Sequence, residues 1–189
     1  MKSNNKVAVV AGVGAGLGIA LCKKLMSEGY SVAGLSRGAT IEAEFGNHYL
    51  ALACDISDAD SVDKAITTVE KQLGIVNVYI HNAAYLVHKP FLELNEAEFT
   101  DIWKTSCLGA MHGMQRVLPN MLSNKSGTIL VSGATASVKA GAEFAAFASA
   151  KFALRGLTQS LAREFGPKGI HIAHILLDGN MDAGIRFTS

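Results

Sequence analysis

The stretch AGVGAGLG at residues 11–18 joins a short apolar run to a segment with helical periodicity. Residues 6–12 predict a strand, and residues 16–28 predict a helix because apolar residues recur every three or four positions. A sharp turn from a strand into a helix leaves backbone amides free at the helix N-terminus, where the helix dipole also favours an anion. Glycines in such a turn let a phosphate approach the main chain. The stretch therefore predicts a phosphate-binding turn.

The spacing of the glycines bears on the ligand. Gly12, Gly16 and Gly18 give G-x-x-x-G-x-G, which differs from the general dinucleotide spacing G-x-G-x-x-G. A glycine-rich turn can also be merely tight, so the spacing leaves both alternatives open. The place of the turn between the first strand and the first helix favours a dinucleotide. We therefore predict that a dinucleotide cofactor is bound by Gly12, Gly16, Leu17 and Gly18.

Short apolar runs alternate with amphipathic stretches along the whole chain. The runs are nearly continuously apolar, which is typical of strands that are buried on both faces. Strand–helix alternation then predicts an α/β fold of the Rossmann type, a doubly wound parallel sheet in three α/β/α layers. Strands are predicted at 6–12, 30–36, 49–56, 76–82, 127–133 and 169–177, and helices at 16–28, 59–73, 96–122 and 143–166. No repeat or low-complexity linker interrupts the pattern, so we predict one domain over residues 1–189.

The composition argues against several classes of protein. Hydrophobic residues make up 49% of the chain and charged residues 17%, which excludes a disordered chain. A net charge of +1 offers no broad electrostatic surface for nucleic acid or an anionic membrane. The three cysteines are odd in number and lack metal-ligand spacing. We therefore predict a reducing, cytoplasmic location and no metal site.

The apolar run that follows Lys2 and Lys6 has some features of a secretory signal. It contains four glycines and no persuasive small-x-small cleavage site, and glycine breaks the helix that such a signal needs. No glycine-free apolar run reaches the roughly 20 residues of a membrane-spanning helix. We expect neither secretion nor a membrane span.

The end of the second predicted strand bears on which dinucleotide binds. Folds that prefer NAD usually place an acidic residue here, where it binds the ribose 2′-hydroxyl. This chain has Ser36 followed by Arg37. A carboxylate would repel a 2′-phosphate, whereas an arginine can pair with it through two hydrogen bonds. We predict NADP(H) rather than NAD(H), with Ser36 and Arg37 in the site; the alternative is an arginine that lies on the surface without a ligand.

A lysine interrupts the apolar stripe of the last predicted helix. Lys151 lies between Phe147 and Leu154 at helical spacing. Burial of an ammonium is costly unless something binds it. Either a partner binds the ammonium of Lys151, or the side chain extends along the surface until its ammonium reaches solvent.

Together these features resemble the short-chain dehydrogenase/reductase family, and the resemblance spans essentially the whole chain. It rests on the glycine motif, on CDIS at 54–57, HNAA at 81–84 and DGNMDAG at 178–184, and on the segment that begins FAAFASAKFAL at residue 144. The resemblance implies that Asp55, with Ile56 beside it, lies at the adenine. It also implies that Asn82, Ala83 and Gly179 contribute to the cofactor site.

The same resemblance implies a hydride-transfer site made of Asn, Ser, Tyr and Lys. The family's lysine matches Lys151, which would bind the nicotinamide ribose and lower the pKa of the tyrosine. The tyrosine position, four residues earlier, corresponds to Phe147, and the asparagine position corresponds to Ser106. The serine position falls near Gly133 or Ala134, flanked by Ser132 and Thr135, and Asp178 stands where the family has proline. This chain thus matches the family's site clearly at the lysine.

Two functions remain open on these residues. The first is an oxidoreductase that acts on a small carbonyl or alcohol. Because the developing alkoxide needs a proton donor that Phe147 cannot supply, Tyr85, expected near the nicotinamide, or His88 would have to replace it, with Ser132 or Thr135 binding the carbonyl oxygen. Tyr85 has the alternative of being a packing aromatic. The second function is a weak or inactive dinucleotide-binding protein that acts as a cofactor sensor or partner subunit.

The resemblance has two further implications. Members of the family commonly pair through the long helix and the active-site helix, which here carry small and apolar residues on more than one face, so we expect a homodimer or homotetramer. Members also usually continue into a segment that covers the substrate. We expect that segment to be absent from residues 1–189, and the sequence therefore does not identify the substrate.

Overall fold

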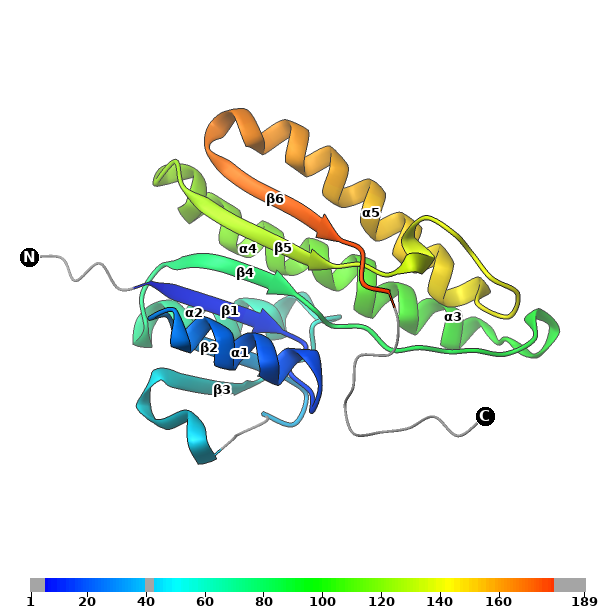
Figure 1. Cartoon of the computed structure of the whole chain (residues 1–189), viewed down its shortest axis with the longest axis horizontal. Helices are drawn as coiled ribbons and strands as arrows, with labels where there is room; N and C mark the ends of the chain where they lie inside the picture. Colours follow the sequence, from blue (N-terminus) through cyan, green and yellow to red (C-terminus); the bar gives the residue numbers. More distant parts are fainter. Residues whose placement is uncertain (1–5, 40–42, 179–189) are drawn as a thin grey trace, which may run out of the picture.

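The computed structural model describes residues 6–39 and 43–178. Within them, six parallel strands form one sheet in the order β3-β2-β1-β4-β5-β6 (Figure 1). The strands are β1 (Val7–Ala11), β2 (Ser31–Ser36), β3 (Tyr49–Ala53), β4 (Val76–His81), β5 (Gly127–Ser132) and β6 (Ile170–Ile175). The α-helices are α1 (Leu17–Ser27), α2 (Ala59–Gln72), α3 (Glu96–Trp103), α4 (Gly109–Ser123) and α5 (Ala145–Phe165). The predicted Rossmann-type parallel sheet is confirmed.

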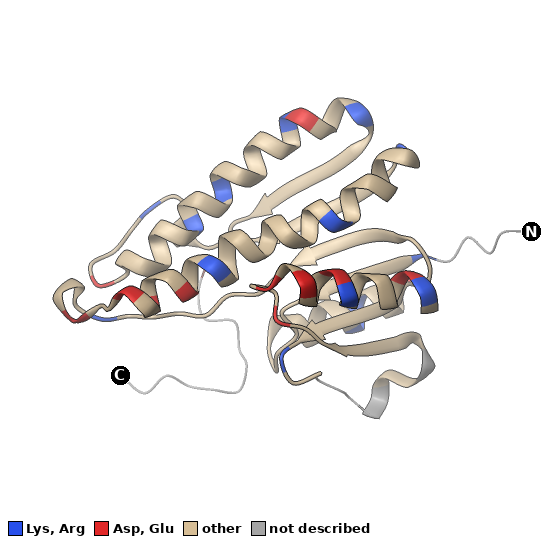
Figure 2. Ribbon diagram, turned by 180° about the vertical axis from the view of Figure 1, so that it is seen from behind, with Lys and Arg blue, Asp and Glu red and all other residues tan. Residues whose placement is uncertain are grey.

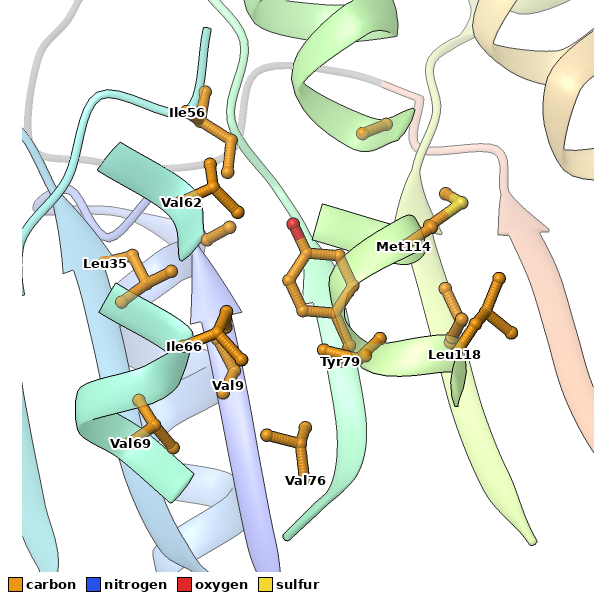
Figure 3. Close-up of a cluster of buried hydrophobic side chains, with 14 of the residues drawn as sticks. Val9, Leu35, Ile56, Val62, Ile66, Val69, Val76, Tyr79, Met114 and Leu118 are labelled. Atoms are coloured by element: carbon orange, nitrogen blue, oxygen red, sulfur yellow. The ribbon is translucent and has the colours of Figure 1, made fainter. Parts of the chain in front are cut away.

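Helices cover both faces of the sheet, as the three-layer prediction requires. Successive residues of a strand point to opposite faces, and the two halves of the core follow this alternation. Val9 packs with α2, α4 and α5 on one face, whereas Val10 packs with α1 on the other. Figure 2 shows α2, α4 and α5 side by side over the first face. Figure 3 shows part of the core beneath them, where Tyr79 of β4 lies between Ile66 of α2 and Met114 of α4.

The strand order places a crevice beside β1. After β1 the chain builds β2 and β3 on one side, and it then crosses over to β4 on the other side. In open α/β sheets, ligands bind at this reversal, outside the carboxyl ends of the strands. The glycine-rich turn follows β1 and the HNAA segment begins at the end of β4, so both lie at the reversal (Figure 1).

The helix predicted over 96–122 is wrong as a single α-helix. A π-turn at Lys104–Leu108, labelled η3, separates α3 from α4. A π-turn inserts one residue into a helix, and an apolar periodicity does not reveal such an insertion. The next residue, Gly109, approaches the loop after β3 so closely that a Cβ would lie 2.9 Å from the carbonyl oxygen of Ile56. None of the described helices has the length and apolar character that a bilayer crossing requires.

Candidate functional site

An open cleft of about 880 Å³ lies at the carboxyl ends of β1, β2, β3 and β4. Its walls come from the glycine-rich turn, the residues after β2 and β3, the segment after β4 and one side of the α3–π-turn region. Eleven of the residues proposed from the sequence line this cleft: Gly12, Gly16, Leu17, Gly18, Ser36, Arg37, Asp55, Ile56, Asn82, Ala83 and Tyr85. Lys151, Phe147, Ser106 and Ser132 are not among its lining residues, and Gly179 lies outside the described residues.

The glycine-rich turn is held by the strands around it. Gly12 and Val13 both donate their backbone N–H groups to the carbonyl of Leu35, at 2.9 and 3.1 Å. The side-chain amide of Asn82 donates to the carbonyl of Gly12 at 2.9 Å. Gly12 has a φ of +95°, and a Cβ there would lie 2.5 Å from the backbone of Ala83. The turn therefore requires glycine at this position, because the Cβ of any other residue would collide with the backbone of the HNAA segment.

The N-terminus of α1 suits a phosphate. Gly16 caps the helix without a side-chain hydrogen bond, and the first turn contains no acidic residue. Amides at a helix N-terminus that no side chain caps remain free for an anion, and the helix dipole favours the same charge. The volume of the cleft is in the range of cofactor sites. The residues present therefore fit the pyrophosphate of a dinucleotide.

Arg37, after β2, and Asp55, after β3, place opposite charges near each other at one edge of the cleft. Asp55 accepts hydrogen bonds from the amide and the hydroxyl of Ser57, at 2.9 and 2.7 Å. These bonds lower the pKa of the Asp55 carboxyl, and the nearby charge of Arg37 acts in the same direction. This end of the cleft therefore presents an ionised carboxylate and a guanidinium together.

Lys151 is buried beneath the end of β5. The residue is only 4% exposed, and its ammonium donates a hydrogen bond of 2.8 Å to the carbonyl of Ser132. Within residues 6–39 and 43–178 it forms no ion pair with a carboxylate. Burial lowers the pKa of Lys151 to about 8. The burial contradicts the alternative of an ammonium that reaches solvent.

Phe147 lies against this ammonium. Its ring centroid is 5.6 Å from Nζ of Lys151, one helical turn away on α5. The face of an aromatic ring attracts a cation but offers no hydrogen-bonding group. The structure thus brings Lys151, Phe147 and Ser132 together, although Ser132 contributes its backbone carbonyl to Lys151 rather than its hydroxyl.

The remaining candidate donors form no hydrogen bond or ion pair with Lys151 among the residues that the structure describes, and they have surroundings of their own. His88 packs on Phe144 at the start of α5, with ring centroids 4.4 Å apart. Tyr85 is 40% exposed; burial, Asp101 and Glu98 raise its pKa, and Arg37 lowers it. Tyr85 therefore shares the cleft with Arg37, and the structure does not bring it together with Lys151. His88 pairs with Glu143 at 3.1 Å, and the hydroxyl of Thr135 donates to Asp178 at 2.6 Å. His88 and Thr135 therefore already have partners.

Two sets of residues were missed by sequence reasoning. Asp101, Lys104 and Thr105 line the cleft from the helix side. Their spacing of three and four residues could have placed them on one face, but nothing pointed that face at the cleft. The other missed residue is His81, which is fully buried together with Ser106.

Comparisons with known proteins agree with this geometry. A model of the short chain dehydrogenase family matches residues 6–184. The 3-oxoacyl-[acyl-carrier-protein] reductase MabA of Mycobacterium avium is 29% identical, over 94% of this chain and 68% of its own length. A solved short-chain dehydrogenase from Rhodopseudomonas palustris is 34% identical with a TM-score of 0.83, over 94% and 88% of the two chains. A metagenomic short-chain oxidoreductase in complex with NADP is 26% identical with a TM-score of 0.84, over 93% and 82%.

Proposed function

The chain belongs to the short-chain dehydrogenase/reductase family of oxidoreductases, and from this premise we propose that it binds NADP(H) and transfers hydride between that cofactor and a small carbonyl or alcohol substrate. The observation that carries the proposal is the cleft itself. It combines an uncapped helix N-terminus after β1 with Arg37 after β2, groups that can bind a pyrophosphate and a 2′-phosphate. Similarity to the metagenomic oxidoreductase in complex with NADP supports the same cofactor.

Each part of the cleft has a role in this proposal. The turn from Gly12 to Gly18 binds the pyrophosphate through backbone amides, while Asp55 and Ile56 lie at the adenine. Lys151 does not line the cleft; in this proposal its ammonium, held by the carbonyl of Ser132, uses its remaining N–H groups to donate to the ribose hydroxyls of the bound cofactor. NADPH supplies the hydride when it is bound. Two observations support a carbonyl substrate. A carbonyl carbon accepts a hydride, and the name of the Mycobacterium avium relative includes a 3-oxo group and the word reductase.

A second function is favoured by Phe147. A site that reduces a carbonyl needs a group that donates a proton to the developing alkoxide, and the ring beside Lys151 has none. In this alternative the chain binds the dinucleotide but turns over slowly or not at all, and it acts as a cofactor sensor or a partner subunit. The alternatives share one cofactor site and differ in the rate of hydride transfer.

The cofactor preference tests the binding site common to both alternatives. We expect NADPH to bind more tightly than NADH, and Arg37→Ala to remove most of the difference. A charge-assisted hydrogen bond contributes about 1.5–3 kcal/mol, which corresponds to roughly tenfold or more in affinity. Fluorescence titration of the wild type and the variant with both cofactors measures this difference in affinity.

Lys104 provides a matched control for Arg37, because it is another cation that lines the cleft, from the helix side. Lys104→Ala is expected to change the affinities for NADPH and NADH by the same factor. Equal affinities in the wild type would overturn the NADP(H) preference. Failure of the wild type to bind either dinucleotide would overturn the proposed function as a whole.

We also propose that two or four copies associate through the predicted long helix, which comprises α3 and α4, and through α5. Trp103 at the end of α3 and Phe152 on α5 remain exposed, although an aromatic side chain gains more than most from burial. Light scattering at micromolar concentration is expected to give at least twice the 19.9 kDa mass of one chain. Phe152→Glu should lower that mass, whereas Phe91→Glu, at an exposed aromatic outside both helices, should not. A wild-type monomer would refute the association.

Two further expectations accompany this proposal. The three cysteines are free and buried, which suits a reducing compartment, and we propose a cytoplasmic location. We also propose that residues 1–189 form a single domain, because one continuous sheet connects the elements on both sides of the cleft.

A further inference from the structure

His81 is a buried titratable residue to which the proposed function gives no role. It is the last residue of β4, where it pairs with Ala11 of β1 and Val131 of β5 in the middle of the sheet. Residues two apart on a strand share a face, so its side chain points to the same side as that of Tyr79, whose ring lies against α4 (Figure 3). A fully buried histidine at this place calls for a physical reason, because burial of unpaired polar atoms is costly.

Several polar atoms around His81 lack partners. Among the described residues, neither ring nitrogen forms a hydrogen bond, and the hydroxyl of the buried Ser106 forms none either. Burial lowers the pKa of His81 to about 3, the charge of Lys151 acts in the same direction, and backbone groups of Ser106 and Thr105 oppose the fall. The ring is therefore a neutral imidazole at neutral pH, with one donor and one acceptor directed among these groups.

The backbone beside this ring departs from α-helical hydrogen bonding. Ser106 and Thr105 belong to the π-turn Lys104–Leu108. In a π-turn an N–H bonds to the carbonyl five residues back instead of four, so the regular ladder is interrupted. Buried backbone groups at such an interruption need partners from side chains or internal water. The imidazole of His81, beside the backbone of Thr105 and Ser106, offers a donor and an acceptor that such groups can use.

The π-turn decides which side chains face the cleft. One residue of an α-helix corresponds to about 100° of rotation, so loss of the inserted residue would rotate α3 by roughly that angle relative to α4. Gly109, packed against Ile56, holds the start of α4 in place. The residues before the π-turn and at its start would therefore move instead, and Asp101, Lys104 and Thr105 would leave the wall of the cleft.

We propose that His81 is a positioning residue, which holds the backbone of the π-turn through an internal water and thereby keeps Asp101, Lys104 and Thr105 in the wall of the cleft. Loss of the imidazole loosens the π-turn first and weakens the cofactor site as a consequence. The effect on the backbone is independent of what the cleft binds. Only the effect on cofactor affinity rests on the proposed function.

The test compares His81→Phe, which keeps a planar ring without nitrogens, with His81→Asn, which keeps a donor and an acceptor. Tyr79→Phe is the matched control, because it also removes a buried unpaired polar atom from the same strand and the same face. Hydrogen exchange of the amides of residues 104–109, thermal unfolding and NADPH titration are measured on all four proteins. In His81→Phe we expect exchange in this segment to rise about tenfold, the factor for one lost hydrogen bond, and NADPH affinity to fall. His81→Asn restores part of both, and Tyr79→Phe changes neither.

The outcomes separate this inference from the proposed function. If His81→Phe exchanges like the wild type at 104–109 and unfolds at the same or a higher temperature, His81 is a tolerated buried polar group and the inference is overturned. If the wild type does not bind NADPH, the proposed function fails while the exchange data still decide the role of His81. If His81→Phe does not fold, His81→Met takes its place in the same comparison, because methionine fills irregular core space.

Discussion

Replacement of Phe147 with tyrosine is expected to raise the rate of carbonyl reduction with NADPH by about 10² or more, the usual scale for a general acid. The substitution adds one hydroxyl to a ring whose centroid lies 5.6 Å from Nζ of Lys151. A phenol close to an ammonium has a lowered pKa, because the charge favours the phenolate. The new hydroxyl therefore becomes a better proton donor than a free tyrosine. Steady-state rates with a panel of aldehydes, ketones and quinones measure the gain.

Phe91→Tyr is the control for this gain. Phe91 is 70% exposed and lies outside the helix that carries Lys151. The same hydroxyl added there is expected to leave the slow wild-type rate unchanged. Absence of a gain in Phe147→Tyr despite tight NADPH binding would favour the binding-only alternative. In that case Ser106 and the loop of Gly133 and Ala134, where the chain also departs from the family's pattern, would be the next positions to restore.

Fast wild-type turnover that disappears in Tyr85→Phe would show that another donor has taken over.

The stability of the protein is expected to rise between about pH 8 and pH 10.5 because of Lys151. Its pKa is about 8 in the folded protein, against an ordinary value of 10.5. In this window the unfolded chain still binds the proton that the folded protein has released, so the free energy of unfolding increases with pH. The shift corresponds to about 3 kcal/mol across the window. Lys151→Met is expected to abolish this rise and to weaken NADPH binding.

Other groups change stability in the same range with the opposite sign. Burial raises the pKa of Cys22 to about 12, so the folded thiol keeps a proton that the unfolded chain loses, and stability falls as the pH rises. The measurement is therefore the difference between wild type and Lys151→Met in urea unfolding at each pH, in which the cysteine contribution cancels. Lys168→Met is the control: Lys168 also lies over a phenylalanine ring, at 4.9 Å, but it is exposed. A Lys151→Met profile parallel to that of the wild type would contradict the burial of a titrating ammonium.

The two predictions bear on different properties of one side chain. The stability profile reports whether Lys151 is buried without a counter-charge, whatever the cleft binds. The Phe147→Tyr rates report whether the buried ammonium lies where a phenol would be useful. If the stability profile shows a buried ammonium but Phe147→Tyr brings no gain in rate, the protein binds the cofactor and has an incomplete catalytic site.

Much of the architecture could be predicted from local sequence patterns. The glycine-rich turn, the nearly continuous apolar strands and the helical periodicities depend on residues close together in the chain, and these patterns predicted the parallel sheet and the position of the cleft. The residues that line the cleft follow from the same logic, because the carboxyl ends of parallel strands meet at one edge of the sheet. Arg37 and Asp55 lie together there for this reason.

Burial and helix phase were decided by the tertiary structure. Lys151 interrupts an apolar stripe in the sequence, but only the packing of α5 against β6 and the neighbouring end of β5 shows that its ammonium binds a backbone carbonyl instead of water. The π-turn changes a hydrogen-bond spacing from four residues to five, and the residue types in this segment do not predict that change. Tyr85 lies in the part of the cleft with Arg37 for a similar reason, because the course of a loop depends on contacts with segments far away in the chain. Local preference determined the elements of this protein, and long-range packing determined the surroundings of each polar group.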